Sequence, residues 1–287
     1  MEILLNILRF SAPVSLAAMG ETVGQKSGLI NIGLEGMMLT AAYVSVEVAT
    51  RSGNAWLGLL SGVLAAVVMG LVQALFTIKW AIDQVVIGTA INLAAIGLTS
   101  TLFEANYGGA GKLLDAPSLL IAGKYDVILI LLIPFFLAVT WALFRTNWGL
   151  ALRATGEYPD AAEAAGFSAQ GLRYQAQLIG AIFAGLAGVY LSLGIASSFA
   201  INMTAGRGFV AIAMVTFGRW KPLWVLGASL LVGFAESLQY LLQSTSSGLP
   251  PQLFKAIPYL LALAVLIVVG RGTVAPASLA VPYRRSK

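Results

Sequence analysis

Long apolar runs constrain this chain more than any other feature of its sequence. Of its 287 residues, 59% are hydrophobic and 10% are charged, whereas a soluble domain carries about a quarter charged residues. The charges gather in short gaps and leave apolar runs of about 20 residues, the length that crosses a bilayer as a helix. The strand-length alternation typical of an outer-membrane barrel is absent. The runs therefore predict an all-α, polytopic transmembrane helical bundle.

The apolar runs divide a single transmembrane domain, residues 1–287, into eight or nine membrane segments. One of them, at about nine residues, is too short to span as a straight helix, so we expect a half-helix or an extension into flanking residues. The expected segments are Ile3–Met19, Leu34–Thr50, Trp56–Trp80, Val85–Phe103, Val127–Phe144, Leu172–Gly194, Phe209–Phe217, Leu223–Leu242 and Phe254–Val269.

One polar interruption, residues 145–173, holds six of the 29 Lys, Arg, Asp and Glu residues. Within it, Pro159 can begin a helix and Gly166 can end it. Asp160 and Glu163 fall in the first turns, where negative charge suits the helix dipole. About two turns of Ala-rich helix are too short to be stable alone in water. We therefore expect another protein to grip this helix, with a plain connecting loop as the alternative.

The distribution of basic residues predicts an orientation in the membrane. If residues 145–173 face the cytoplasm, eleven of the 17 Lys and Arg residues lie on that side and six lie outside. This excess agrees with the positive-inside rule, and a basic cytoplasmic tail over residues 271–287 contributes most to it. The amino terminus is then expected outside and the carboxyl terminus in the cytoplasm. The net charge of +5 is explained without a nucleic-acid partner.

Small residues recur four apart on two of the expected segments. Gly58 and Gly62 form one pair, and Gly180, Ala184 and Gly188 form a row along one helix face. Such residues let spanning helices approach closely. Close packing inside one subunit is the favoured interpretation, and a dimer seam is the alternative.

A second polar stretch, Gly20–Gly36, is rich in glycine and lies where the chain turns between spans. Non-helical backbone near membrane depth is tolerated only when it is buried in protein or lines a water-filled cavity. The stretch is therefore either a gate or pathway wall, or an interfacial turn with a capped helix start. Polar groups within or near spans usually face a pathway or a partner. The candidate pathway residues are Asn31, Glu35, Glu47, Asn92 and Glu236, of which Glu47 and Glu236 lie near predicted span ends.

Three stretches carry a resemblance to a known family. They are GQKSGLINIGLEGMM at Gly24–Met38, ALRATGEYPDAAEAAG at Ala151–Gly166 and GRGFVAIAMVTFGRWKP at Gly206–Pro222. Together, in this order and spacing, they resemble the nucleoside and simple-sugar branch of ABC importer permeases, within the superfamily that also serves branched-chain amino acids and ribose. The resemblance further implies that an initial span of the ribose-type relatives has no counterpart here, in keeping with the expected outside amino terminus.

The resemblance implies a complete ATP-driven importer in the bacterial inner membrane. This chain and a second, paralogous permease subunit (or a second copy) would form the pathway for a nucleoside or related small polar solute. Separate ATP-binding subunits would hydrolyse ATP, and an external lipoprotein or periplasmic protein would deliver the substrate. A sugar, an amino acid or a vitamin is the alternative substrate. The residues implied in ATPase coupling are Glu157, Pro159, Asp160, Ala161, Glu163, Ala164, Ala165 and Gly166.

Two other function classes fit the sequence less well. An ion-coupled secondary transporter usually shows charged relays or broken helices at the middle of its spans, and these segments are nearly free of charge. A membrane-embedded enzyme would need reactive groups, but the chain has no His, no Cys and no clustered carboxylates. We therefore expect a non-catalytic subunit without cofactor or metal.

Overall fold

The computed structural model describes residues 2–108, 114–121, 125–245, 260 and 274–284. Over these residues the chain is a helical bundle with one short antiparallel ladder, in which β1 (Leu120–Ile121) pairs with β2 (Tyr125–Asp126). The predicted all-α class is confirmed apart from this ladder. The expected span Phe254–Val269, apart from Leu260, lies outside the described residues, as do residues 271–273 and 285–287 of the expected basic tail.

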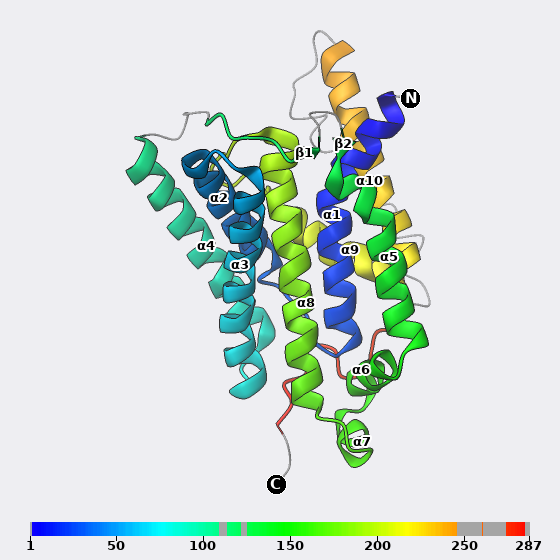
Figure 1. The fold of residues 1–287 in the computed structure, drawn as a ribbon. Helices are drawn as coiled ribbons and strands as arrows, with labels where there is room; N and C mark the ends of the chain where they lie inside the picture. Colours follow the sequence, from blue (N-terminus) through cyan, green and yellow to red (C-terminus); the bar gives the residue numbers. More distant parts are fainter. Residues whose placement is uncertain (1, 109–113, 122–124, 246–259, 261–273, 285–287) are drawn as a thin grey trace.

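The helices follow one another along the chain as in Figure 1. They are α1 (Glu2–Lys26), α2 (Leu34–Ser52), α3 (Ala55–Ala74) with a π-helical end (Leu75–Lys79), α4 (Gln84–Tyr107), α5 (Val127–Arg145), α6 (Asn147–Glu157), α7 (Pro159–Ala164), α8 (Ala169–Val189) with a π-helical end (Tyr190–Ala196), α9 (Arg207–Phe217) and α10 (Pro222–Thr245). Five are long and apolar enough to cross a membrane: α3, α4, α5, α8 and α10. The expected half-helix is α9, which has 11 residues.

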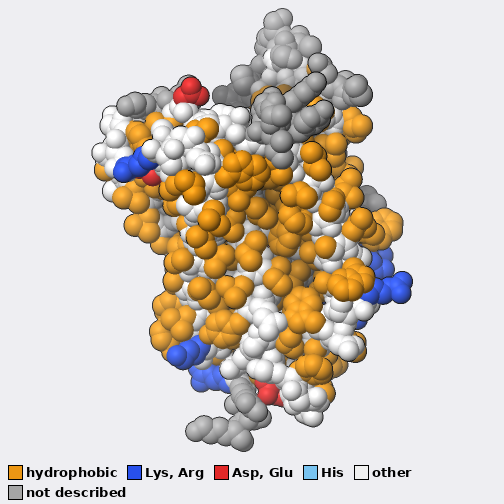
Figure 2. Space-filling view, in the orientation of Figure 1, with side chains coloured by type: hydrophobic (Ala, Val, Ile, Leu, Met, Phe, Trp, Pro, Cys, Tyr) orange, Lys and Arg blue, Asp and Glu red, His pale blue; other side chains and the backbone are white. Residues whose placement is uncertain are grey.

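The helices at the centre of the bundle are more deeply buried than those at its edge. In α3, α4, α5 and α10 only 28% of the apolar window is buried, against 67% in α8. Figure 2 shows the resulting surface, on which hydrophobic side chains dominate the visible face. Helices α1 and α2 are also long and largely buried. Because protein rather than lipid surrounds them, they can carry polar side chains that a lipid-facing helix cannot.

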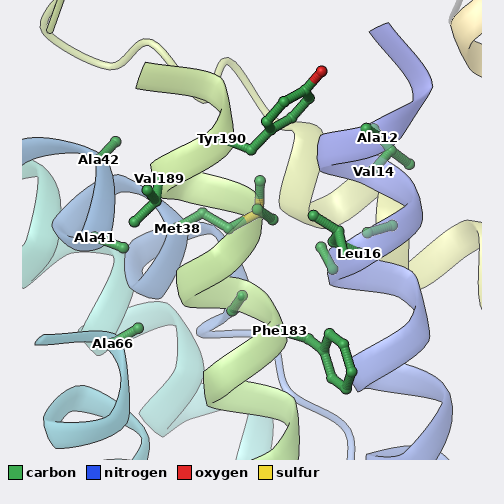
Figure 3. Packing of buried hydrophobic residues seen from close by; sticks show 14 of the residues in the cluster. Ala12, Val14, Leu16, Met38, Ala41, Ala42, Ala66, Phe183, Val189 and Tyr190 are labelled. Atoms are coloured by element: carbon green, nitrogen blue, oxygen red, sulfur yellow. The ribbon is translucent and has the colours of Figure 1, made fainter. Parts of the chain in front are cut away.

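Helix α8 packs between α1 and the pair α2 and α3, as Figure 3 shows. Small residues allow this close approach. A Cβ atom added at Gly62 would lie 2.6 Å from a methyl carbon of Val189, and one added at Gly58 would lie 2.6 Å from the carbonyl oxygen of Ser45. Gly188 likewise faces the backbone of α2. The prediction that these small residues serve packing within one subunit is confirmed.

The two ends of the bundle differ in what they carry. Helix α1 begins at one end, whereas α6, α7 and residues 274–284 gather at the other (Figure 1). The sequence predicted a single short helix within residues 145–173, but two are present, because α6 precedes α7. This end of the molecule therefore presents a compact helical loop rather than one isolated turn.

Candidate functional site

The loop formed by residues 145–173, here called the coupling loop, is built from local helix signals. The Thr146 hydroxyl accepts the backbone N–H of Gly149 at 3.1 Å and so caps α6. Pro159 stands in the first turn of α7, and Gly166 ends the turn in a left-handed conformation with φ of +88°. Both predicted helix boundaries are confirmed. The Glu163 carboxylate accepts the backbone N–H of Ala169 at 3.0 Å, which fastens α7 to the start of α8.

An apolar surface on α7 faces solvent. Three alanines of the predicted coupling set are exposed along it: Ala161, Ala164 and Ala165. Two aromatic residues that the sequence reasoning missed flank them, Tyr158 at 70% exposed and Phe167 at 45% exposed. Exposed aromatics beside a short helix are typical of residues that anchor a protein interface. Their position next to the Pro159 and Gly166 boundaries is the signal that could have identified them.

Two further members of the predicted coupling set contact residues near the carboxyl terminus. The Glu157 carboxylate accepts the backbone N–H of Ala277 at 3.1 Å, and the Asp160 carboxylate accepts the Tyr283 hydroxyl at 3.0 Å. Their acidic groups therefore hold another segment of the same chain and leave the alanine surface of α7 uncovered by it.

A second candidate site lies where the loop before α2 meets the start of α9. Glu35, which is 4% exposed, accepts the backbone N–H of Gly206 at 2.7 Å and that of Gly208 at 2.6 Å. A carboxylate is favourable there because the first N–H groups of a helix lack partners and carry partial positive charge. A Cβ atom at Gly208 would lie 2.6 Å from the Glu35 backbone nitrogen, so this approach requires glycine.

Asn92 of α4 holds the same loop from the opposite side. Its side-chain oxygen accepts the backbone N–H of Gly36, and its nitrogen donates to the carbonyl oxygen of Ile32, both at 2.8 Å. The backbone N–H of Asn31 donates to the Glu21 carboxylate at 3.1 Å. Thus the structure brings the predicted residues Asn31, Glu35 and Asn92 together around one loop.

Glu21 belongs to this site although the sequence reasoning did not name it. It is 1% exposed, and its carboxylate accepts the Gln25 side-chain amide at 2.8 Å. The Gln25 oxygen in turn accepts the indole N–H of Trp220 at 2.7 Å, which ties α1 to the connection between α9 and α10. The signal was available, because Glu21 and Gln25 are four apart within the polar stretch Gly20–Gly36.

We name the group formed by Glu21, Asn31, Glu35, Asn92 and the start of α9 the polar junction. Some buried side-chain oxygens in and beside it could accept further hydrogen bonds. Within the described residues, one buried oxygen each of Glu21 and Asn31 has no partner, and the same holds for the side-chain oxygen of Gln73 in α3, which lies against Gly33 of the same loop. Buried polar groups are normally hydrogen-bonded, to protein or to water. The polar side chains of the junction are therefore chemically suited to line a passage that water or a polar solute occupies.

The two remaining predicted pathway residues lie in different places. Glu236 of α10 forms an ion pair with Arg207, the first residue of α9, at 3.3 Å, and so joins the same helix start that Glu35 caps. Glu47 lies apart, near the carboxyl ends of α2 and α4. It accepts the Tyr107 hydroxyl at 2.5 Å and forms an ion pair with Arg51, and this carboxylate raises the pKa of the Arg51 guanidinium.

Across the described part of the chain, no group of three or more His, Cys, Asp or Glu residues could hold a metal ion. The polar groups of the junction are amides, carboxylates and backbone N–H groups that engage one another. What this arrangement can do chemically is bind and orient polar, uncharged groups, or keep a loop in place beside a passage.

Comparison with known proteins decides the family. The sequence matches the branched-chain amino acid transport system / permease component family over residues 3–269. The chain belongs to this family. It is 33% identical to the guanosine ABC transporter permease protein NupQ of Bacillus subtilis, over 98% of this chain and 95% of that protein. It is 28% identical to the nucleoside ABC transporter permease protein NupC of Lactococcus lactis, over 99% and 97% respectively.

Other relatives carry a different substrate in their names. The glucose ABC transporter permease protein TsgB13 of Haloferax volcanii is 26% identical over 75% of this chain and 63% of that protein. Among solved structures, an inward-facing ABC transporter assigned to the metal-chelate type has a TM-score of 0.59 at 15% identity, over 92% of this chain and 85% of that one. This last likeness concerns the fold alone. The predicted family resemblance is confirmed, and the chain is a multi-pass membrane permease component.

Proposed function

We propose that this permease component works in an ATP-driven importer in which a separate ATP-binding subunit grips the coupling loop in the cytoplasm. The observation that carries the proposal is the exposed alanine surface of α7, flanked by Tyr158 and Phe167, at one end of a membrane bundle. Because helix α7 is too short to be independently stable, packing of this surface against a partner would stabilise it. The amino terminus then lies outside, and the carboxyl-terminal tail lies inside.

The coupling role has a direct test. Replacing residues Ala161–Gly166 with a flexible Gly/Ser stretch of equal length removes the rigid surface without touching a membrane span. Uptake is expected to be lost while the subunit remains in the membrane at its normal level. Normal uptake by this variant would refute the coupling role.

For the substrate, we propose a nucleoside. The relatives named for guanosine and nucleoside transport align with nearly the whole chain, which supports this choice over the other solutes the family carries. A nucleoside offers hydroxyl groups and base edges but no fixed charge, and the amides of the polar junction suit such groups. Glucose is the second candidate, supported by the relatives from Haloferax volcanii.

Competition for uptake separates the two substrates. Uptake of labelled guanosine is expected to persist in a large excess of glucose and to be suppressed by other nucleosides. Suppression by glucose but not by nucleosides would replace the proposed substrate with the second candidate.

We further propose that the pathway lies between this chain and a paralogous permease in a bacterial cell membrane, with an external binding lipoprotein or periplasmic protein. Support for the pairing comes from Bacillus subtilis, in which two relatives, NupQ and NupP, both carry the name of a guanosine ABC transporter permease. In this arrangement Asn31, Glu35, Asn92 and Glu236 shape the pathway wall through the polar junction, and Glu47 lies at its outer edge. Co-purification of a tagged subunit with one paralogue rather than a second copy of itself tests the pairing.

A further inference from the structure

Residues 274–284, here called the tail strap, join two parts of the molecule that are far apart in sequence. Near the carboxyl terminus the chain lies against the coupling loop on one side and against the loop between α1 and α2 on the other. Ser278 and Tyr283 of the strap are 8% and 9% exposed. The strap is therefore packed into the end of the bundle rather than extended into solvent.

The strap is bound to the coupling loop through both backbone and side chains. The backbone N–H and the hydroxyl of Ser278 donate to the carbonyl oxygen of Gly156, at 2.9 and 2.7 Å. The Tyr283 hydroxyl donates to the Asp160 carboxylate on α7 at 3.0 Å. The strap is therefore tied to the coupling loop at two points, one at the end of α6 and one on α7, and a displacement of α7 would pull on it directly through Tyr283.

The same strap is bound to the loop between α1 and α2. The backbone N–H of Ala280 donates to the carbonyl oxygen of Gly28 at 3.1 Å. Gly28 has a φ of +89°, and a Cβ atom there would lie 2.7 Å from the Ser278 hydroxyl oxygen. Only glycine fits at this crossing, so the approach of strap and loop is specified by the sequence.

Arg173, at the start of α8, fastens all three segments together. Its guanidinium donates to the carbonyl oxygen of Ser27 at 3.2 Å, to that of Val281 at 3.2 Å and to the Ser278 hydroxyl at 3.4 Å. The Arg173 charge also lies 5.7 Å from the centre of the Tyr283 ring. Arg173 is 2% exposed and, among the described residues, forms no ion pair. A buried charge satisfied only by these oxygens and this ring holds them firmly in place.

From this geometry we propose that the tail strap transmits movement of α7 to the polar junction, with Arg173, Ser278 and Tyr283 as its positioning residues. The last link is short, because the loop that the strap holds continues to Ile30 and Asn31. The backbone N–H of Ile30 donates to the Gln84 side chain at 2.7 Å, and that of Asn31 donates to Glu21 at 3.1 Å. The inference rests on the proposed coupling role of α7 and adds a mechanical route from it to the pathway.

The test uses the whole transporter in proteoliposomes, with its ATP-binding subunit, its paralogous permease and its binding protein. The variants are Tyr283→Phe, which removes one hydroxyl and keeps the ring under Arg173, and Ser278→Ala. Labelled guanosine taken up per ATP hydrolysed is expected to fall about fivefold in Tyr283→Phe, the factor that corresponds to one lost hydrogen bond, and at least as much in Ser278→Ala, which removes a hydroxyl that bonds both Gly156 and Arg173. The hydrolysis rate itself is expected to stay near that of the unmodified transporter.

Matched variants separate transmission from a merely structural role. Val274→Ala alters a strap residue that is 87% exposed, and it should leave the ratio of uptake to hydrolysis unchanged. Asp160→Asn keeps an oxygen that accepts the Tyr283 hydroxyl and should retain coupling, whereas Asp160→Ala should lose it. The double variant Asp160→Ala/Tyr283→Phe should be no worse than either single one, because both remove the same contact.

Each outcome decides between two claims. An unchanged uptake-to-hydrolysis ratio in Tyr283→Phe and Ser278→Ala would overturn the strap inference, as would equal losses of uptake and hydrolysis that follow the amount of assembled complex. If, in addition, the Gly/Ser replacement of Ala161–Gly166 still abolishes uptake, the proposed coupling role of α7 survives that failure. If that replacement leaves uptake normal, the proposed function fails first and the strap inference with it.

Discussion

Buried acidic side chains hold the start of α9 from two sides. Glu35 accepts two backbone N–H groups there, and Glu236 forms an ion pair with Arg207. In an apolar bundle each of these groups is costly unless it is satisfied. We therefore expect Glu35 and Glu236 to set the position of α9 in the pathway wall, rather than to bind a cation.

Removing the Glu35 carboxylate should destabilise the bundle measurably. Glu35→Ala leaves two buried N–H groups without an acceptor, a loss of about 2 kcal/mol or more, whereas Glu35→Gln keeps one acceptor and should cost about 1 kcal/mol. The apparent melting temperature in detergent, followed by size-exclusion chromatography, should fall in that order. Glu104→Gln, at an exposed position of α4, is the control. Equal melting temperatures for Glu35→Ala and Glu104→Gln would contradict the capping role.

The Arg207 and Glu236 pair should behave as a unit in a double-mutant cycle. Either single change, Arg207→Gln or Glu236→Gln, leaves an uncompensated and largely buried charge, which costs about 1–3 kcal/mol. The double variant should therefore melt at a higher temperature than the sum of the two single losses predicts. Strict additivity of the melting-temperature shifts would show that the pair is not coupled.

Among the elements, the sequence predicts those whose signals are local and misses those that depend on distant partners. Pro159 and Gly166 delimit α7 because proline and glycine act on their own backbone. Helix α6 was missed because Gly149 and Gly156 weaken its helical pattern, and the structure uses them for close contacts with α5 and with the α1–α2 loop. The role of Glu21 and the contacts of the tail strap depend on segments that only the folded chain brings together.

The aromatic pair beside α7 should contribute to the grip of the ATP-binding subunit. Tyr158→Ala and Phe167→Ala remove exposed rings and leave the fold intact, and each should weaken association with that subunit by about tenfold, as expected for an interface anchor of more than 1 kcal/mol. Pull-down assays with the tagged permease and increasing concentrations of the ATP-binding subunit measure this affinity. Trp56→Ala, an equally exposed aromatic change at the start of α3, provides the comparison. Unchanged affinity for both variants would exclude the pair from the interface.

The two ends of the molecule carry different structural elements. The coupling loop and the tail strap occupy one end, and the start of α1 lies at the other (Figure 1). Central helices α1, α2 and α8 enclose polar side chains, while α3, α4, α5 and α10 leave most of their apolar windows exposed. This arrangement lets a push on α7 reach the polar junction through protein alone. Such a route requires that the coupling loop face the cytoplasm.

Cysteine labelling can establish on which side of the membrane the coupling loop lies, because the chain has no cysteine of its own. Ala164→Cys places a thiol on the exposed surface of α7, and Ser52→Cys places one at the exposed end of α2. In spheroplasts of cells that make this subunit without the ATP-binding subunit, a membrane-impermeant maleimide should label Ser52→Cys but not Ala164→Cys. In inside-out vesicles from the same cells, where no partner covers α7, the pattern should reverse. Labelling of Ala164→Cys from outside intact spheroplasts would place the coupling loop outside and rule out a cytoplasmic partner for α7.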